Sequence, residues 1–301
     1  MRGTGDFWLD SVPTGTVIRE DRSSRSTRAA TAGCRSRPPM PELPDVETVA
    51  RRLRRHLRGR RIRRVQLITP STVRFPDPPA FARLLRGRRV HDIGRRGKYL
   101  LITLEGDLTL VAHLRMTGDF VIAQPDDPVD RHARIVFYLD GRQLRFTDQR
   151  RFGHMDLLTS DQLSRFPGLL HMGIEPLEPE FTLRKFRMIL RDRRGTLKSV
   201  VLRQDLIAGI GNIYADEILW QARLHPARGA ATLRTDQITR LHRAIRRVLR
   251  QAVVRLSRYG RPVGRFLDAR DRTGRCPRCG RPLRVARIAG RTTYFCPFCQ
   301  R

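Results

Sequence analysis

The sequence contains few acidic residues: 29 Asp and Glu stand against 61 Lys and Arg, which gives a formal net charge of +32. Charge of this size indicates binding partners rather than a fold, and it makes an acidic substrate or surface the expected partner. Nucleic acid is the first choice, ahead of ribosomal, chromatin or acidic-lipid surfaces. A genome biased toward arginine codons contributes to the excess, because only three of the basic residues are lysines.

Long apolar runs are also missing. No segment approaches the roughly 18 consecutive apolar residues that a transmembrane helix needs, and no signal-peptide core is present. We therefore expect a soluble, cytoplasmic protein associated with the nucleoid and without membrane contact. The chain has only five cysteines, and disulfides are unlikely in that compartment. No internal repeat is evident, and 301 residues are enough for two domains with good cores.

Residues 1–39 lack apolar periodicity and are rich in Gly, Ser, Thr, Pro and Arg. A segment of this composition cannot bury enough surface to order itself, so we expect a disordered extension outside the mature protein. A basic tail and a transit peptide are alternatives, although four acidic residues weigh against the latter. A third interpretation is that translation starts at Met40.

Residues 40–160 show a different pattern. Pro44 suits the first turn of a helix, and apolar residues then recur at helical spacing until Gly59. Strand-like segments separated by short turns follow, which predicts antiparallel hairpins. The natural architecture is a β-sandwich or barrel with one leading helix. The predicted strands are "RRVQLI", "RVHDIG", "GKYLLITLEG", "DLTLVAHLRMTGDFVIA", "ARIVFYLDG" and "RQLRFTDQ".

A Pro-rich linker at residues 161–180 leads into helical sequence at 181–260. Helices are predicted for "TLRKFRMILRD", "TLKSVVLRQD" and "IYADEILWQAR", and a longer helix is capped by Thr235 and ended by Gly260. The turn "LIAGIGN" precedes the third helix. Its backbone N–H groups could bind a phosphate, although tight helix packing explains the glycines equally well.

Residues 261–301 carry the strongest local signal. Two CxxC pairs, separated by sixteen residues, match the spacing of a tetrahedral structural Zn²⁺ site. Between the pairs, "RVARIAGRTTYF" predicts a hairpin that turns at Ala289-Gly290 and is too short to have a core of its own. A redox CxxC would need no second pair, and Cys34 has no partner in this pattern. The four predicted ligands are Cys276, Cys279, Cys296 and Cys299.

Taken together, these segments resemble the formamidopyrimidine-DNA glycosylase family of bifunctional DNA repair enzymes, which includes the endonuclease VIII type. The resemblance covers Met40 to Arg301, and "PELP" favours the formamidopyrimidine branch. It implies an α+β fold: a β-sandwich with a leading helix, a helix-two-turn-helix domain and a four-cysteine β-hairpin zinc finger. The motifs are "MPELPDVE", "RRGKYLL", "HLRMTG", "TDQRRFG", "QDLIAGIGNIYADEIL" and the cysteine ribbon.

The resemblance implies an enzyme that removes oxidised or ring-opened purines and nicks the DNA by β,δ-elimination. Pro41 matches the family's nucleophile, and Glu42 matches the acid that protonates the sugar ring oxygen. Lys98 matches the lysine that assists base loss and β-elimination. A lysine in a chain that otherwise uses arginine suggests that the position needs an ammonium able to release a proton. Arg291 matches the zinc-finger arginine credited with aiding δ-elimination.

The family chemistry requires a free amine on Pro41. Inside a polypeptide this nitrogen is a tertiary amide, whereas a chain-terminal amine titrates near neutral pH and can attack a sugar carbon. We therefore expect translation to start at Met40, followed by removal of the methionine, in preference to cleavage before Pro41. With residues 1–39 attached, the protein would be an inactive DNA-binding protein.

The remaining family matches concern contacts with damaged double-stranded DNA, which we expect a monomer to bind. Chemistry on a base requires its extrusion from the stack, and three residues match those that fill the vacated space: Met116, Arg150 and Phe152. Four further residues match contacts to the DNA backbone: His132, Arg193, Lys198 and Asn212.

One departure from the family concerns substrate choice. Residues 261–275 form a shorter segment than the family usually has before its first zinc-binding cysteine. The missing length includes the flexible loop that closes over 8-oxoguanine. Reduced discrimination for 8-oxoguanine, and an endonuclease VIII-like activity on oxidised pyrimidines, are therefore open alternatives.

Overall fold

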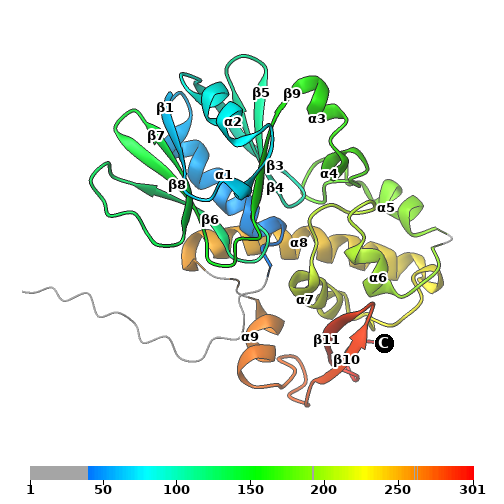
Figure 1. Ribbon diagram of the computed structural model, residues 1–301. Helices are drawn as coiled ribbons and strands as arrows, with labels where there is room; N and C mark the ends of the chain where they lie inside the picture. The colour runs from blue at the N-terminus through cyan, green and yellow to red at the C-terminus, as the bar shows by residue number, and fades with distance from the viewer. Residues whose placement is uncertain (1–39, 192, 261, 263) are drawn as a thin grey trace, which may run out of the picture. The chain divides into compact units, whose positions relative to one another are not determined.

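A computed structural model describes residues 40–191, 193–260, 262 and 264–301. The expectations for residues 1–39, including Cys34, lie outside the described residues. None of the helices in the described ranges is long and apolar enough to cross a membrane. Figure 1 shows the arrangement of the elements named below.

Helix α1 (Leu43–Leu57) forms where the apolar periodicity predicted it. Pro44 lies in the first turn, where a missing N–H costs nothing. The carboxylate of Asp45 accepts a hydrogen bond from the backbone N–H of Glu42 at 2.9 Å, which satisfies one donor at the helix start. The apolar face is buried, and arginines occupy the other face. The fully buried apolar residues are Leu43, Val46, Leu53 and Leu57.

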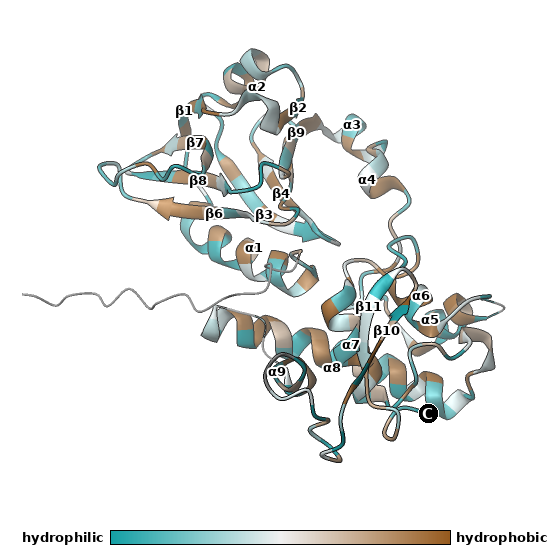
Figure 2. Ribbon diagram, turned by 60° about the horizontal axis from the view of Figure 1, so that its bottom comes forward, coloured by the Kyte–Doolittle hydropathy of each residue, from teal (hydrophilic) through white to brown (hydrophobic). Residues whose placement is uncertain are grey.

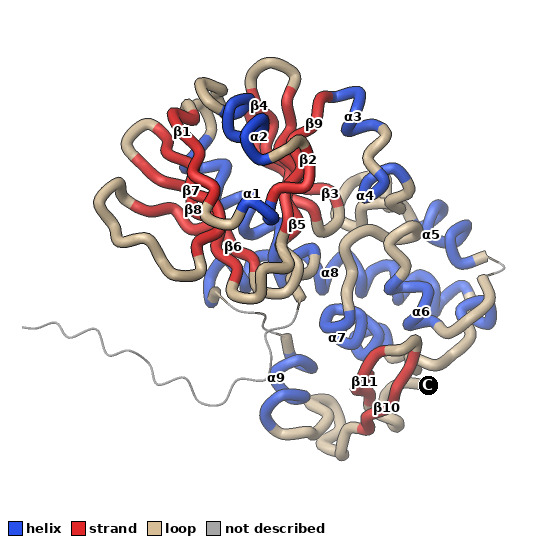
Figure 3. Tube along the Cα trace, viewed as in Figure 1, coloured by secondary structure: helices blue, strands red, loops and turns tan. Residues whose placement is uncertain are grey.

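Two sheets follow, and they share one apolar core with α1. The first has the order β1-β7-β8-β6, and the second has the order β2-β9-β5-β4-β3, in which only β2 and β9 pair in parallel. Phe120, Phe137 and Phe146 from the first sheet belong to the same cluster as Leu100, Leu110 and Met155 from the second. The predicted sandwich is confirmed. Figure 3 shows these strands in red.

The strand bounds are as follows: β1 Ile62–Leu67, β2 Val73–Phe75, β3 Val90–Arg96, β4 Tyr99–Leu104, β5 Leu108–His113, β6 Gly118–Ala123, β7 Ala133–Leu139, β8 Arg142–Asp148 and β9 His154–Thr159. The long segment "DLTLVAHLRMTGDFVIA" therefore supplies two strands in different sheets, and "LRMT" is the connection between them. Sequence periodicity did not predict η1 (Pro70–Thr72) or α2 (Pro78–Leu85).

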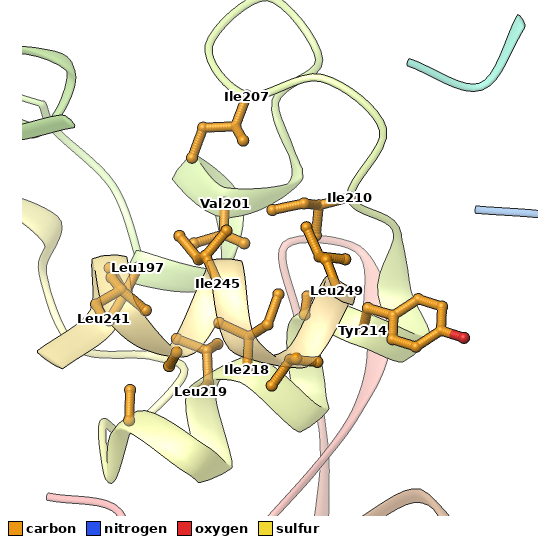
Figure 4. Close-up of a cluster of buried hydrophobic side chains, with 14 of the residues drawn as sticks. Leu197, Val201, Ile207, Ile210, Tyr214, Ile218, Leu219, Leu241, Ile245 and Leu249 are labelled. Carbon is orange, nitrogen blue, oxygen red and sulfur yellow. The ribbon is translucent and has the colours of Figure 1, made fainter. Parts of the chain in front are cut away.

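The helical part has its own core, shown in Figure 4. Helix α8 is amphipathic, as Figure 2 shows by its mixed brown and teal residues. Arg234, not Thr235, occupies its N-cap position, so the predicted cap was displaced by one residue; Gly260 ends the helix as expected. The helices are α3 Ser160–Ser164, α4 Pro167–Leu170, α5 Leu183–Leu190, α6 Leu197–Leu202, α7 Asn212–Ala222, η2 Ala230–Thr232 and α8 Thr235–Tyr259.

The C-terminal part begins with a helix that the sequence did not predict, α9 (Arg265–Arg272), followed by the predicted hairpin of β10 (Arg284–Ile288) and β11 (Arg291–Phe295). The hairpin turns at Ala289-Gly290, both with positive φ. A positive φ is accessible to Gly and uncommon for Ala. The only apolar cluster among the described residues of this part is small, and it depends on Trp220 of α7.

Candidate active site

Pro41 is half-buried and lines a pocket of about 520 Å³. The walls come from the start of α1, from the connection between β5 and β6, and from the C-terminal end of α8. Asp45, Met116 and Ser257 represent these three walls. The residue expected to be the nucleophile is therefore placed in a concave site large enough for part of a nucleotide.

Glu42 is buried, and its carboxylate lies at the N-terminus of helix α7. It accepts backbone N–H groups from Gly211 at 2.8 Å, Ile213 at 2.8 Å and Tyr214 at 3.2 Å. These donors have no partner within the helix, and the helix dipole favours a negative charge there. Glu42 is thereby held in one orientation by a helix that begins 170 residues later in the chain.

The glycines of "LIAGIGN" make this contact possible. A Cβ on Gly211 would lie 2.3 Å from Cδ of Glu42, and a Cβ on Gly209 would lie 2.6 Å from Cβ of Leu43. Gly209 also accepts the backbone N–H of Leu43 at 3.0 Å. The turn therefore binds the start of the sandwich domain. Within the turn, the N–H of Gly211 is bound by Glu42 and the N–H of Gly209 by Gln204 at 2.8 Å, so neither is open for a phosphate.

Burial raises the pKa of Glu42 to about 7, although Lys98 and the backbone N–H groups favour the charged form. The pKa of Asp45 is also raised by burial, to about 6, against the hydrogen bond from the N–H of Glu42. A carboxylic acid that retains its proton near neutral pH is suited to general acid catalysis. Glu42 has this property in the structure.

Lys98 lies in the turn between β3 and β4, next to Gly97. Burial lowers its pKa, Glu42 and Asp45 oppose the change, and the positive charge of Arg291 adds to it. Glu175 of the linker holds this turn in place. Its carboxylate accepts the backbone N–H of Gly97 at 2.5 Å and forms an ion pair with Arg95. The structure thus brings Lys98, Glu42 and Arg291 together from three distant parts of the chain.

The three predicted base-stack residues lie on two adjoining loops. Met116 lines the pocket of Pro41, and Phe152 is half exposed with the guanidinium of Arg150 4.6 Å above its ring. Asp148 joins the loops: its carboxylate accepts the hydroxyl of Thr117 and the backbone N–H of Arg150. This geometry leaves an aromatic ring and a guanidinium available at the surface, where both can stack on bases.

The start of β11, which carries Arg291, lies beside the start of α7, which carries Asn212. Arg291 is exposed at the start of β11. The side-chain amide of Asn212, at the start of α7, donates to the carbonyl of Thr292 at 3.0 Å, and its oxygen is buried without a partner among the described residues. Asn212 therefore connects the helix that holds Glu42 to the hairpin that holds Arg291.

Lys198 does not lie where the family match placed it. Its side chain is completely buried in α6, and its ammonium donates to Asp216 at 2.6 Å and to Thr293 at 2.7 Å. An ammonium with these partners cannot reach a DNA phosphate in this structure. Sequence matching did not predict the burial of Lys198, because a motif identifies the type of a residue and not how far its side chain is buried.

Neither His132 nor Arg193 lines the pocket of Pro41. His132 lines a separate pocket of about 450 Å³ with Thr117, and its carbonyl accepts the N–H of Asp148. Arg193 follows α5 and donates back to the carbonyl of Ile189 at 3.1 Å. The structure thus places the backbone of His132 against the loop of Arg150, whereas the guanidinium of Arg193 folds back onto the end of α5.

The four predicted metal ligands form a cluster, with all four Sγ atoms within 4.8 Å of one another. Cys276 and Cys299 are 3.9 Å apart, and Cys279 and Cys296 are 3.6 Å apart. A tetrahedron with Zn–S bonds of about 2.3 Å has S···S edges of about 3.8 Å. Nε1 of Trp220 donates to Sγ of Cys276 at 3.3 Å, which suits a thiolate. The donor set therefore fits Zn²⁺.

Two important residues were missed by the sequence reasoning. Asp148 orders the loops of Arg150 and Met116. The signal that could have identified it is its position as the only acidic residue in the motif "TDQRRFG". Asp216 pairs with the buried Lys198, and "IYADEI" gave no sign of it beyond a carboxylate on an apolar helix. Tyr214 of the same helix has a buried hydroxyl without a partner among the described residues, and Figure 4 shows it pointing away from the apolar side chains.

Comparison with known proteins places these features in a family context. Three family models match in succession: the formamidopyrimidine-DNA glycosylase N-terminal domain over residues 40–155, the formamidopyrimidine-DNA glycosylase H2TH domain over 172–259, and a zinc finger found in FPG and IleRS over 274–301.

Full-length relatives agree. A formamidopyrimidine-DNA glycosylase of Symbiobacterium thermophilum is 48% identical over 247 residues, covering 78% of this chain and 81% of the relative. One from Chloroflexus aurantiacus is 44% identical over 237 residues, covering 75% and 84%. The structure of Lactococcus lactis Fpg with abasic-site DNA matches with a TM-score of 0.79 and 34% identity, covering 86% of this chain and 99% of that one.

Proposed function

On the premise that this chain belongs to the formamidopyrimidine-DNA glycosylase family, as the matches show, we propose which residues carry the reaction. The protein is a DNA glycosylase of base excision repair that removes oxidised purines, and its partner is damaged double-stranded DNA. The observation that supports the residue assignment best is that Pro41 lines the pocket, that the buried Glu42 directly follows it, and that Lys98 lies close enough to Glu42 for each to affect the pKa of the other.

In the proposed first step, the free amine of Pro41 attacks C1′ of the extruded nucleotide. The bond between C1′ and the base breaks, and the base leaves with its electron pair and a proton. Glu42 gives its proton to O4′ as the sugar ring opens, which its raised pKa permits near neutral pH. The product is an iminium between Pro41 and C1′.

The iminium then withdraws electrons, so a proton can leave C2′ and the C3′–O bond breaks; this is β-elimination. Loss of a second proton at C4′ breaks the C5′–O bond, which is δ-elimination and leaves phosphate ends on both sides. Water finally releases the sugar fragment from Pro41. We assign proton transfer during base loss and β-elimination to Lys98, and the support of the second elimination to Arg291.

This mechanism needs a free amine on Pro41, so the active form is one whose chain begins there. The test is borohydride trapping on abasic-site DNA, with a form that begins at Pro41 and the 301-residue form compared under one condition. The short form should be trapped through the Pro41 nitrogen, and the long form should bind DNA without an adduct. Equal trapping by an uncleaved long form would exclude Pro41 as the nucleophile.

We propose that Met116, Arg150 and Phe152 fill the space left by the extruded base. The half-exposed Phe152 with its stacked Arg150 supports this role. Replacing all three with Ala should leave salt-dependent binding to duplex DNA unchanged, because that depends on phosphate contacts. Lesion excision should slow markedly. Parent-like excision by the triple variant would refute the assignment.

We further propose that the chain discriminates weakly in favour of 8-oxoguanine. Residues 264–272 form the N-cap and body of α9, so they do not supply a loop. The carboxylate of Glu217 in α7 accepts the backbone N–H groups of Phe266 and Leu267 in the first turn of α9. Ring-opened purines, abasic sites and oxidised pyrimidines should then compete well. Excision rates across these substrates decide the matter, and a strong preference for 8-oxoguanine opposite cytosine would contradict it.

The remaining assignments complete the proposal. One structural Zn²⁺ is held by the four clustered thiolates, Asn212 and Arg291 contact the DNA backbone, and His132 and Arg193 do so at the edges. The domain division proposed is 40–160, 161–180, 181–260 and 261–301, and action on DNA would place a monomer at the nucleoid in the cytoplasm.

A further inference from the structure

Asp216 of helix α7 is a buried carboxylate with partners from three segments. One oxygen accepts the ammonium of Lys198 at 2.6 Å. The other accepts the backbone N–H of Tyr294 at 3.2 Å and lies 3.5 Å from the guanidinium of Arg270. Asp216 is 1% exposed and Lys198 0%, so this ion pair is shielded from water.

The partners of this pair lie on consecutive residues of β11. Lys198 donates to the hydroxyl of Thr293, which is fully buried, and Asp216 accepts from Tyr294. The preceding residue, Thr292, is held through its carbonyl by Asn212. Three successive residues of the strand are therefore fixed to α6 and α7, immediately after the exposed Arg291.

An apolar pair would pack in this position at lower cost. Removing two charges from water is unfavourable, and buried ion pairs often contribute little to stability compared with apolar residues of similar volume. What they do supply is direction, because each charge requires its hydrogen bonds in one geometry. The hairpin has almost no core of its own, so its orientation depends on such anchors and on the cysteine cluster.

We propose that Asp216 and Lys198 are positioning residues that fix strand β11 and thereby hold Arg291 beside the N-terminus of α7, where Glu42 is bound. This inference rests on the proposed function, in which Arg291 supports δ-elimination. It replaces the expected phosphate contact of Lys198 by an action through the hairpin. The pair touches no reacting atom and acts only on the second elimination.

The test uses the chain that begins at Pro41, loaded with zinc, on abasic-site DNA. Asp216→Asn would leave a buried ammonium unpaired and could fail to fold, so the main variant is Lys198→Met with Asp216→Asn. It removes both charges at similar volume. We expect the δ-elimination product to fall at least fivefold relative to β-elimination, while borohydride trapping at Pro41 stays within twofold of the parent. Thr293→Val should produce a smaller fall in the same direction.

Zinc content and thermal unfolding of each variant serve as controls. An unchanged product ratio in the double variant overturns the inference. A parallel fall in trapping and in both products also overturns it, because the pair would then only support the fold. Arg291→Ala distinguishes failure of the proposed function from failure of this inference. If Arg291→Ala leaves the δ-elimination product intact, the proposed role of Arg291 is wrong. If Arg291→Ala removes that product and the double variant does not, only the positioning role of Asp216 and Lys198 is wrong.

Discussion

The two halves of the site are held in place by different means. Pro41, Glu42 and Lys98 are carried by a sandwich whose two sheets and helix share one large apolar core. Arg291 is carried by a hairpin with a four-residue cluster, four clustered thiols and a buried ion pair. Hydrophobic burial contributes in proportion to area, so the hairpin cannot rely on it. The comparison teaches that the sandwich is fixed by packing and the hairpin by a few directional contacts.

The strongest test of this division concerns Glu42. Glu42→Gln keeps the shape but removes the proton donor, so excision of a damaged base should fall by about 10²- to 10⁴-fold. Zinc content should remain because the four cysteines belong to the other half, and affinity for duplex DNA should remain because Glu42 is assigned no contact with a phosphate. Single-turnover excision and equilibrium binding measure these two effects, and a loss of zinc in this variant would break the proposed separation.

Disruption of the hairpin should have the converse effect. Cys279→Ser, or removal of zinc by a chelator, should unfold the hairpin because no core replaces the metal. DNA affinity should fall because the phosphate contacts of the hairpin are lost, and δ-elimination should disappear. The unfolding transition of the sandwich should persist. Calorimetry with metal analysis tests this. Thr232→Ser, at an exposed position outside the zinc finger, serves as the control. A single transition lost as a whole would show that the halves are not separable.

The pH dependence of excision sharpens the comparison further. With the pKa of Glu42 at about 7, base removal should decline above pH 7, approaching tenfold for each pH unit, as the acid loses its proton. Nicking of abasic sites, which have no base to lose, should decline less over this range. A common pH profile for both reactions would contradict the role of Glu42 as the acid.

A smaller effect concerns stability. Because folding raises the pKa of Glu42 from 4.5 to about 7, its contribution is fully present below pH 4.5 and is lost as the pH rises through 7. The parent should therefore lose up to about 3 kcal/mol of unfolding free energy, relative to Glu42→Gln, between pH 4.5 and pH 8, because Gln does not titrate. Denaturant titrations of both proteins at several pH values measure it; a pH-independent difference would refute the shifted pKa.

Sequence reasoning predicted most of the fold because its signals are local. Helical periodicity gave α1 and α8, and the CxxC spacing gave the cysteine cluster. It missed α9, which has little apolar periodicity and is started by a distant carboxylate, Glu217. It also misjudged Lys198, because burial and the pairing with Asp216 arise only when α6, α7 and β11 meet. Depth and long-range pairing are properties of the tertiary structure, and no short motif records them.

The contact between Glu42 and the start of α7 has a consequence for biosynthesis. The acid is among the first residues of the sandwich, while its N–H donors lie 169 to 172 positions later. A ribosome releases the N-terminal segment long before it makes Gly211, and domains fold as they emerge. The sandwich can therefore be complete while its acid still lacks the helix that orients it. On the proposed mechanism, cutting of DNA is thus delayed until the start of α7 has been synthesised, and we expect fragments that end before α7 to leave chromosomal DNA intact.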